Sequence, residues 1–159
     1  QTVIPFIDNN FPTLKTAKGR LLIGFSKSGW GALSLLLRNP DKFHKAAGWD
    51  IGIRVDMGPI SDEERSEKIE RLFGSAANFE KYRISTLLKK QGDLLGKKPR
   101  LFYYNTEGKR ALGGAKIHRL MVDLEIPHYY LYETKRPHRW DSGWIPKAIE
   151  FLIENPTNK

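Results

Sequence analysis

Residues 20–38 constrain the fold of this chain most strongly, because they combine a buried strand, a sharp corner and a helix in immediate succession. Leu21, Leu22 and Ile23 form a short apolar run typical of a parallel strand that is covered on both faces. The leucine-rich segment 32–37 predicts the buried side of a helix. Ser26 lies between the two, so the sequence predicts a tight strand-to-helix turn at this serine.

Small residues around Ser26 make that turn feasible. Gly24 precedes the serine by two positions, and Gly29 and Gly31 follow it. The order is that of a nucleophile elbow, Gly-x-Ser-x-Gly, with Ser28 in place of the last glycine. Ser26 is therefore the candidate nucleophile.

The composition indicates one globular domain. The chain has 159 residues, of which 40% are hydrophobic, and it contains no cysteine, which excludes disulfides, thiolate metal sites and cysteine nucleophiles. No apolar run is long enough to span a bilayer. The chain begins at Gln1 without an initiator methionine or a signal-peptide pattern, so we expect a soluble protein with a truncated or processed N-terminus.

The basic charge is spread along the sequence. The formal net charge is +9, but lysines and arginines occur throughout the chain and no nucleic-acid motif accompanies them. We therefore expect a solvated basic surface and no specific nucleic-acid partner. A phosphate-binding glycine loop is disfavoured because the Walker spacing is absent.

Alternating patterns predict an α/β domain with about four parallel strands. The expected strands are 21–23, 43–49, 101–105 and 128–133, and the expected helices are 3–11, 27–38, 62–73, 115–124 and 144–153. The first helix should cover one face of the sheet. Ser61 and Glu64 form a capping box for the helix over 62–73, which should end at Gly74.

Residues 60–98 are expected to form a helical cap within the single domain 1–159. Beyond residue 74 they carry apolar residues among many lysines, which predicts one or two short helices. Such a segment often roofs a pocket, and a solvated cover without a role in substrate binding is the alternative.

The sheet topology selects one histidine as the base. Ligands of a parallel sheet collect at the carboxyl ends of its strands. His44 and His128 lie at the start of strands and His118 lies within a helix, whereas His138 follows the carboxyl end of the last strand. Serine before histidine is also the chain order of an α/β-hydrolase triad.

Such a pair would support acyl transfer to Ser26 with His138 as general base. The backbone amide of Lys27 is the expected oxyanion donor, because it follows the nucleophile. An ester of a small molecule is the expected substrate. Trp30 and Trp140 are candidate substrate-binding residues, although tryptophans near a core are more often simply packed.

The sequence resembles the esterase family that includes esterase D (S-formylglutathione hydrolase) and the feruloyl esterases. The resemblance rests on Gly-Phe-Ser-Lys-Ser-Gly-Trp-Gly-Ala-Leu at 24–33, on Leu-Arg-Asn-Pro-Asp-Lys-Phe at 37–43 and on the His-x-Trp motif at 138–140. It implies an α/β-hydrolase fold, Ser26 as nucleophile, His138 as base, no cofactor and no metal.

The chain departs from that family in two respects. The aspartate usual after the strand before last is absent, which leaves Glu107, slightly favoured, and Asp50 as candidate acids. Only about one helix precedes Arg20, so we expect the C-terminal part of a longer esterase domain, without its N-terminal strands and with the strand 21–23 near an edge. We expect the missing N-terminal half, or an oligomer partner, to complete the esterase domain. A non-catalytic α/β-hydrolase-like binding module, or an inactive fragment, is the competing interpretation.

Overall fold

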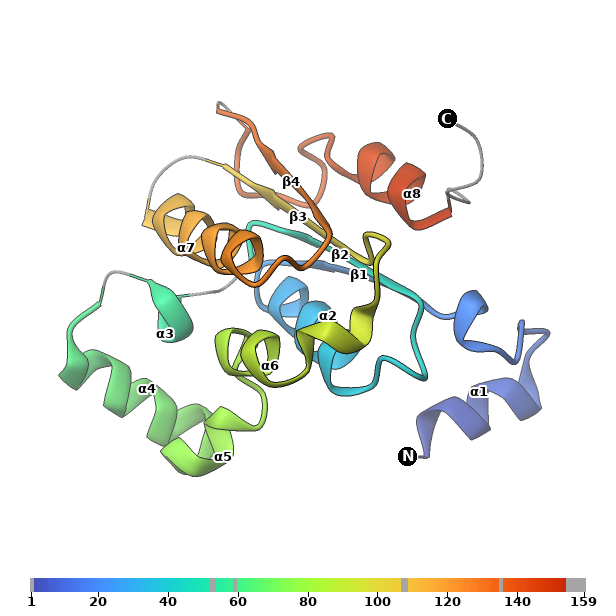
Figure 1. Cartoon of the computed structure of the whole chain (residues 1–159), viewed down its shortest axis with the longest axis horizontal. Helices are drawn as coiled ribbons and strands as arrows, with labels where there is room; N and C mark the ends of the chain where they lie inside the picture. Colours follow the sequence, from blue (N-terminus) through green and yellow to red (C-terminus); the bar gives the residue numbers. More distant parts are fainter. Residues whose placement is uncertain (1, 52–53, 59, 107–108, 135, 154–159) are drawn as a thin grey trace.

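The computed structural model describes residues 2–51, 54–58, 60–106, 109–134 and 136–153. Its centre is a four-stranded sheet in the order β1-β2-β3-β4 (Figure 1). The strands are β1 (Leu21–Phe25), β2 (Lys45–Trp49), β3 (Leu101–Asn105) and β4 (His128–Tyr132). All three neighbouring pairs are parallel, as predicted. The sheet has β1 and β4 at its edges.

The described helices alternate with these strands. They are α1 (Val3–Asn10), α2 (Lys27–Arg38), α3 (Arg54–Met57), α4 (Asp62–Phe73), α5 (Ala76–Glu80), α6 (Ile84–Gln91), α7 (Lys109–Asp123) and α8 (Ile145–Ile153), with short 3₁₀ turns at Ala17–Gly19 and Gly92–Leu95. Among the described residues, no helix is both long enough and apolar enough to cross a membrane.

Helices pack against both faces of the sheet, which gives three layers (Figure 1). One apolar cluster joins α2, α6 and α7 to strand residues such as Ala46, Leu101 and Tyr103. The second joins α8 to Ala47, Phe102 and their neighbours. Successive strand residues alternate between the clusters, as the pleat of a buried strand requires. The predicted three-layer α/β sandwich with a parallel sheet is therefore confirmed.

The helix α4 illustrates how local sequence sets element bounds. The Ser61 side chain accepts a hydrogen bond of 3.1 Å from Glu64 N, and the helix ends at Gly74 with φ of 74°. Both features follow from the predicted capping box and C-terminal glycine. The segment 75–98 forms α5, α6 and a 3₁₀ turn. Of these, α6 belongs to the layer that covers the sheet, whereas α4 and α5 project from it (Figure 1).

The expectation that the first helix covers a sheet face is wrong. No residue of α1 is buried, and Figure 1 shows the helix beside the layers. Its apolar residues Val3 and Phe6 are 73% and 59% exposed. The physical reason is that α2, α6, α7 and α8 already cover most of both sheet faces. An ion pair of 2.5 Å between Asp8 and Arg20 instead ties α1 to the start of β1.

The strand β1 is less covered than its apolar sequence predicted. Ile23 is 38% exposed, and β1 pairs on one side only, with β2. The prediction that this strand lies at an edge is thus confirmed, and the prediction that both of its faces are covered is wrong for Ile23.

The approach of α2 to β1 depends on Gly24. A Cβ at Gly24 would lie 2.3 Å from Ser28 O, and the neighbouring α2 atoms are also backbone. Such contacts cannot be relieved by a rotamer change, so the strand and helix must separate. In contrast, a Cβ at Gly31 on the same helix would have no atom within 4 Å.

We predict that Gly24→Ala lowers the free energy of unfolding by about 2–4 kcal/mol, through overpacking against backbone. The matched control, Gly31→Ala, should leave stability unchanged or raise it by up to about 1 kcal/mol, because alanine favours the helix. Urea unfolding followed by circular dichroism measures both. Equal effects of the two substitutions would contradict the close approach at Gly24.

Candidate active site

The corner between β1 and α2 holds Ser26 in an uncommon backbone conformation. Its φ is 54° and its ψ is −118°, a region that non-glycine residues rarely adopt. Ser26 N donates to Trp49 O at 2.9 Å, and Trp30 N donates to Ser26 O at 3.2 Å. The strand ladder therefore ends on the amide of Ser26, and the first helical turn begins on its carbonyl. This is the geometry of the predicted strand-to-helix turn.

Ser28, which replaces the last glycine of the elbow pattern, has its own place in this corner. Ser28 Oγ accepts a hydrogen bond of 3.0 Å from Phe25 N and donates one of 2.8 Å to Phe25 O. Because Ser26 N faces β2 and successive residues alternate, the polar groups of Phe25 face the open edge of β1. The Ser28 hydroxyl therefore satisfies backbone groups that the edge strand would leave without a partner.

Asp50 follows the carboxyl end of β2 and is fully buried. Its φ is 46°, and its amide donates to Tyr104 O at 2.8 Å. The carboxylate lies beside Thr106, which follows β3: Thr106 N donates to Oδ1 at 3.1 Å, and Thr106 Oγ1 is 2.8 Å from each carboxylate oxygen. These bonds provide the partners that a buried carboxylate requires.

His138 completes a line of side chains from Asp50 to Ser26. Its Nδ1 is 2.9 Å from Asp50 Oδ2, and its Nε2 is 3.2 Å from Ser26 Oγ. A carboxylate only accepts hydrogen bonds, so Nδ1 carries the proton toward Asp50 and the neutral ring accepts from the serine hydroxyl at Nε2. The ring also packs on Phe25, with centroids 4.3 Å apart.

The loop that carries His138 is fixed by charged contacts. Arg136 binds the Glu133 carboxylate at the end of β4 and the Ser142 carbonyl beyond His138, so it spans the loop. Lys147 of α8 also binds Glu133, at 2.5 Å. Hydrogen bonds, led by that of Lys147, lower the pKa of Glu133 to about 2, so this carboxylate stays ionised at neutral pH. Glu133 can therefore hold Arg136 over the whole physiological pH range.

The other candidate residues occupy different places. Lys27 is the first residue of α2, where backbone amides have no partner within the helix. Trp140 packs between Phe25 and Trp144, with ring centroids 5.3 and 5.5 Å away. Glu107 lies outside the described residues. Sequence reasoning missed Thr106, for which the only signal was a hydroxyl directly after a strand at the carboxyl edge.

A pocket of about 360 Å³ opens beside Ser26. It is lined by Ser26, Lys27, Trp30, Val55, Leu72, Phe73 and Phe79. Its walls are mainly apolar, and Phe73 packs against Trp30 and Phe79 at centroid distances of 5.7 and 4.8 Å. Trp30 was expected here from the sequence. The α4 and α5 residues were not, because the predicted cap 60–98 gave no signal of which of its side chains face the serine.

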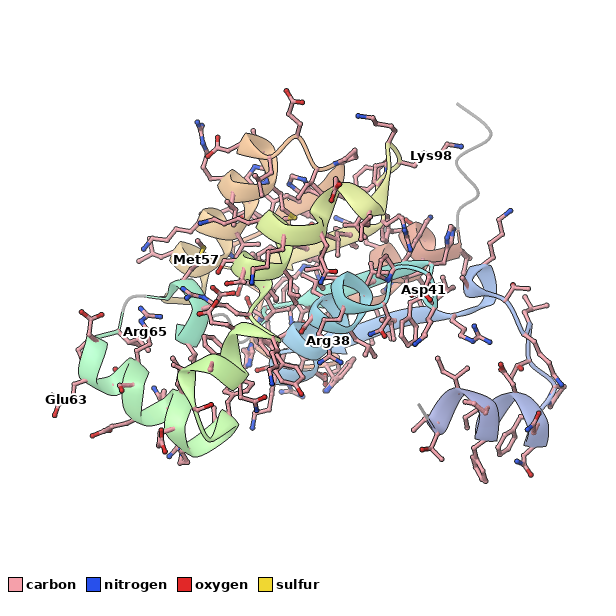
Figure 2. The ribbon with its side chains drawn as sticks, turned by 60° about the horizontal axis from the view of Figure 1, so that its bottom comes forward. Arg38, Asp41, Met57, Glu63, Arg65 and Lys98 are labelled. Atoms are coloured by element: carbon pink, nitrogen blue, oxygen red, sulfur yellow. The ribbon has the colours of Figure 1, made fainter. Side chains whose placement is uncertain are left out.

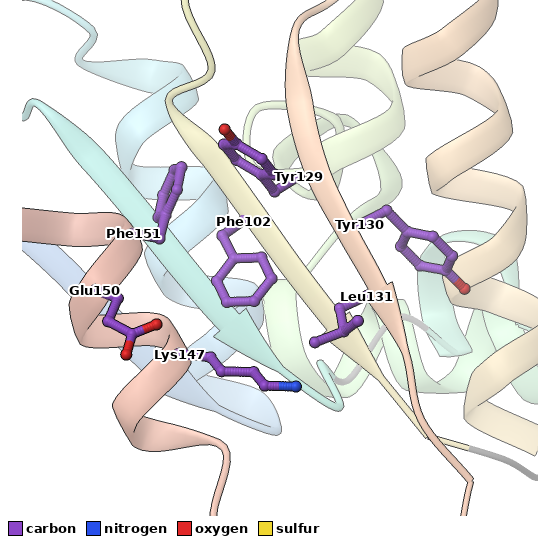
Figure 3. Close-up of a pocket in the computed structure, with 7 residues that line it drawn as sticks. All are labelled: Phe102, Tyr129, Tyr130, Leu131, Lys147, Glu150 and Phe151. Carbon is purple, nitrogen blue, oxygen red and sulfur yellow. The ribbon is translucent and has the colours of Figure 1, made fainter. Parts of the chain in front are cut away.

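A second pocket lies between β3, β4 and α8 and is lined by residues that include Phe102, Tyr129 and Phe151 (Figure 3). Its volume is about 260 Å³, and neither Ser26, His138 nor Asp50 lines it. Within the described part of the chain, no group of three or more histidine, cysteine or acidic residues could hold a metal ion.

The other histidines lie away from Ser26. His118 Nδ1 and His128 Nε2 are 2.8 Å apart, and His128 is the first residue of β4. Burial, and then the neighbouring His128, lowers the pKa of His118. His44 precedes β2. These residues therefore belong to the amino edge of the sheet or to α7, whereas His138 reaches the carboxyl edge.

We predict that Ser26→Gly gives a more stable protein than Ser26→Ala. Both substitutions remove the hydroxyl, but only glycine adopts the observed φ and ψ without strain, which costs about 1–3 kcal/mol at such positions. The free energies of unfolding in urea should differ by about 1 kcal/mol or more in favour of glycine. Equal stabilities would mean that the corner is not strained.

The comparisons with known proteins show similarity to esterases. The sequence model of a family described as Putative esterase matches residues 1–49, which include the elbow. No curated protein matches the chain. Two solved structures that resemble it are a ferulic acid esterase, at 14% identity with a TM-score of 0.73, and an S-formylglutathione hydrolase from Agrobacterium tumefaciens, also at 14% and 0.73. A third is an S-formylglutathione hydrolase from Staphylococcus aureus, at 19% identity and 0.72.

These likenesses cover 96% of this chain in each case. In the other direction, the chain spans 58%, 54% and 61% of the three structures, in the order given above. At sequence identities of 14–19%, these structural similarities show the fold. The chain thus has the α/β-hydrolase fold of these esterases, and its resemblance to the family described as Putative esterase is confirmed.

Proposed function

We propose that this chain carries the catalytic residues of a serine esterase that cleaves carboxylic esters, with Ser26 as nucleophile, His138 as general base and Asp50 as the acid. The observation that carries the proposal is the continuous line from Ser26 Oγ through the His138 ring to the buried Asp50 carboxylate, at 3.2 and 2.9 Å. The match of residues 1–49 to an esterase family supports the same reaction.

In the first half of the reaction, His138 Nε2 takes the proton of the Ser26 hydroxyl while Oγ attacks the ester carbonyl carbon. The carbonyl becomes a tetrahedral oxyanion. When it collapses, the bond to the alcohol oxygen breaks, and the imidazolium gives its proton to the departing alcohol. The acyl group remains on Ser26. Asp50 stays ionised throughout and stabilises the imidazolium by the bond to Nδ1.

In the second half, a water molecule replaces the alcohol. His138 Nε2 takes one proton from the water, whose oxygen attacks the acyl carbon. Collapse of the second oxyanion breaks the bond to Ser26 Oγ, which regains the proton from His138. A carboxylic acid leaves, and the enzyme returns to its starting state without a cofactor.

The amide of Lys27 is the proposed oxyanion donor. It lies at the N-terminus of α2, where an unpaired N–H group and the helix dipole both favour negative charge. An oxyanion donor of this kind contributes about 3–4 kcal/mol to transition-state stabilisation. The strain at Ser26 has a function in this proposal, since it places Oγ and the following amide on the same side of the reacting carbonyl.

The pocket beside Ser26 is the proposed acyl site. Trp30, Phe73 and Phe79 supply aromatic walls, so an apolar acyl group, including one with an aromatic ring, fits its chemistry. One of the similar structures is a ferulic acid esterase, and the acyl group of ferulic acid carries an aromatic ring. Residues of α4 and α5 form much of the wall, which supports a role of the cap in substrate binding.

We predict that a fluorophosphonate probe labels Ser26 in the 159-residue chain. The probe reports an activated serine independently of the substrate, because it reacts with the nucleophile itself. Ser26→Ala should abolish labelling, whereas Ser28→Ala, two residues away, should retain it. Mass spectrometry locates the modified residue. An unlabelled Ser26 in the folded protein would favour the non-catalytic binding module.

A second prediction separates the two acids that the sequence left open. Asp50→Asn should lower kcat for a p-nitrophenyl ester by about 10³–10⁴-fold, because the amide cannot stabilise the imidazolium. Asparagine tolerates positive φ, so the backbone at position 50 should be preserved. Glu107→Gln, the matched control, should change kcat less than twofold. The reverse pattern would make Glu107 the acid.

A further inference from the structure

The amino edge of the sheet carries a third cavity, opposite the edge that holds Ser26. It has a volume of about 520 Å³ and is called the basic cleft below. The charged and titratable residues that line it are Lys18, His44, Lys45, Lys97, Lys98 and Arg100. None of the lining residues carries a carboxylate. Lys45 donates from Nζ to Phe151 O of α8 at 2.6 Å. Four other cations, Lys18, Lys97, Lys98 and Arg100, therefore share one concavity with no acidic side chain in its wall.

The parallel register explains why these residues meet. His44 N donates to Arg20 O at 2.9 Å, and Ala46 N donates to Arg100 O at 2.9 Å. The segments that precede β1, β2 and β3 are thereby held side by side. Residues distant in the sequence, such as Lys18 and Lys98, thus converge at the start of three adjacent strands.

The charges of Lys18, Lys97, Lys98 and Arg100 in the basic cleft are not neutralised by the described part of the chain. Arg100 donates to the carbonyl oxygens of Pro40, Phe43 and His44, at 2.6–2.7 Å. Carbonyls orient a guanidinium but do not cancel its charge. Among the described residues, Lys18, Lys97, Lys98 and Arg100 form no ion pair. Arg20, at the same edge, is paired with Asp8 at 2.5 Å.

The pKa of His44 depends on the charges in the basic cleft. Burial lowers its pKa, and Lys45, Arg100 and Lys18 lower it further. Because these cations lower the His44 pKa in addition to burial, their charge acts on the region around this ring, and an anion there would be favoured. The cations also differ in depth. Lys45 is buried and Arg100 is half-buried, whereas Lys97 and Lys98 are exposed.

We propose that the basic cleft binds a small phosphorylated molecule with at least two phosphate charges, separately from the esterase site. The half-buried Arg100 and the exposed Lys18, Lys97 and Lys98 suit a compact polyanion that enters the concavity. A nucleic-acid backbone would instead favour a basic patch or stripe that extends along one face of the molecule. Figure 2 shows Lys98 at the end of the molecule away from Glu63 and Arg65 of α4.

Pyrophosphate is the probe that tests this proposal. Isothermal titration of the 159-residue chain in chloride buffer should show one saturable site, whose affinity falls as NaCl is raised from 50 to 500 mM. The double substitution Lys97→Gln and Lys98→Gln should weaken binding at least tenfold, because two charge-assisted contacts are lost. The matched control, Lys89→Gln and Lys90→Gln on α6, removes the same charge elsewhere and should change affinity less than twofold.

An independent readout is the titration of His44, followed by NMR. Saturation with pyrophosphate should raise the His44 pKa, since an anion offsets the neighbouring cations. Binding should persist in Ser26→Ala, so its outcome does not depend on esterase activity. Equal weakening by both lysine pairs, or an unchanged His44 pKa, would overturn the proposal. Tighter binding of a DNA duplex that depends on both lysine pairs would also overturn it, in favour of a diffuse basic surface.

Discussion

The buried carboxylate of Asp50 is the interaction on which the carboxyl edge of the sheet depends. A charge without solvent must be matched by donors, and here the donors come from Thr106 after β3 and from His138 after β4. The ends of three consecutive strands are thereby drawn to one point. The same carboxylate orients the imidazole toward Ser26. The same hydrogen bonds thus provide partners for the buried Asp50 carboxylate and hold the proposed base, His138, in position.

The strand β1 pairs with β2 only among the described strands, so the backbone groups on its other side need different partners. Its polar groups at Phe25 bind the Ser28 hydroxyl, and its start is tied to α1 through Arg20 and Asp8. Both contacts occupy the ends of β1 and leave Ile23 half exposed between them. The substitution of serine for the last elbow glycine therefore has a physical basis: it satisfies an edge while leaving room for the helix to approach at Gly24.

Much of this arrangement follows from local sequence. The capping box at Ser61 set the bounds of α4, and the alternation of strands and helices predicted a parallel sheet, whose topology selected His138 over three other histidines. Local sequence did not show which carboxylate contacts His138. Asp50 and Glu107 both follow strand ends, and the contact of Asp50 depends on a positive φ and on Thr106, which are tertiary features. Likewise, the spacing of apolar residues predicted the helix α1, but it did not predict that α1 would lie beside the layers with no buried residue.

The two edges of the sheet differ in what a sequence reveals about them. At the carboxyl edge, the chemistry needs particular residue types in a particular order, so Ser26 and His138 stand out before folding. At the amino edge, the basic cleft is made of lysines and an arginine that look like ordinary surface charge in a chain of net charge +9. Only the register, which aligns the starts of β1, β2 and β3, shows that these charges share a concavity. Scattered charge in a sequence is therefore compatible with concentrated charge in space whenever parallel strands collect the segments that precede them.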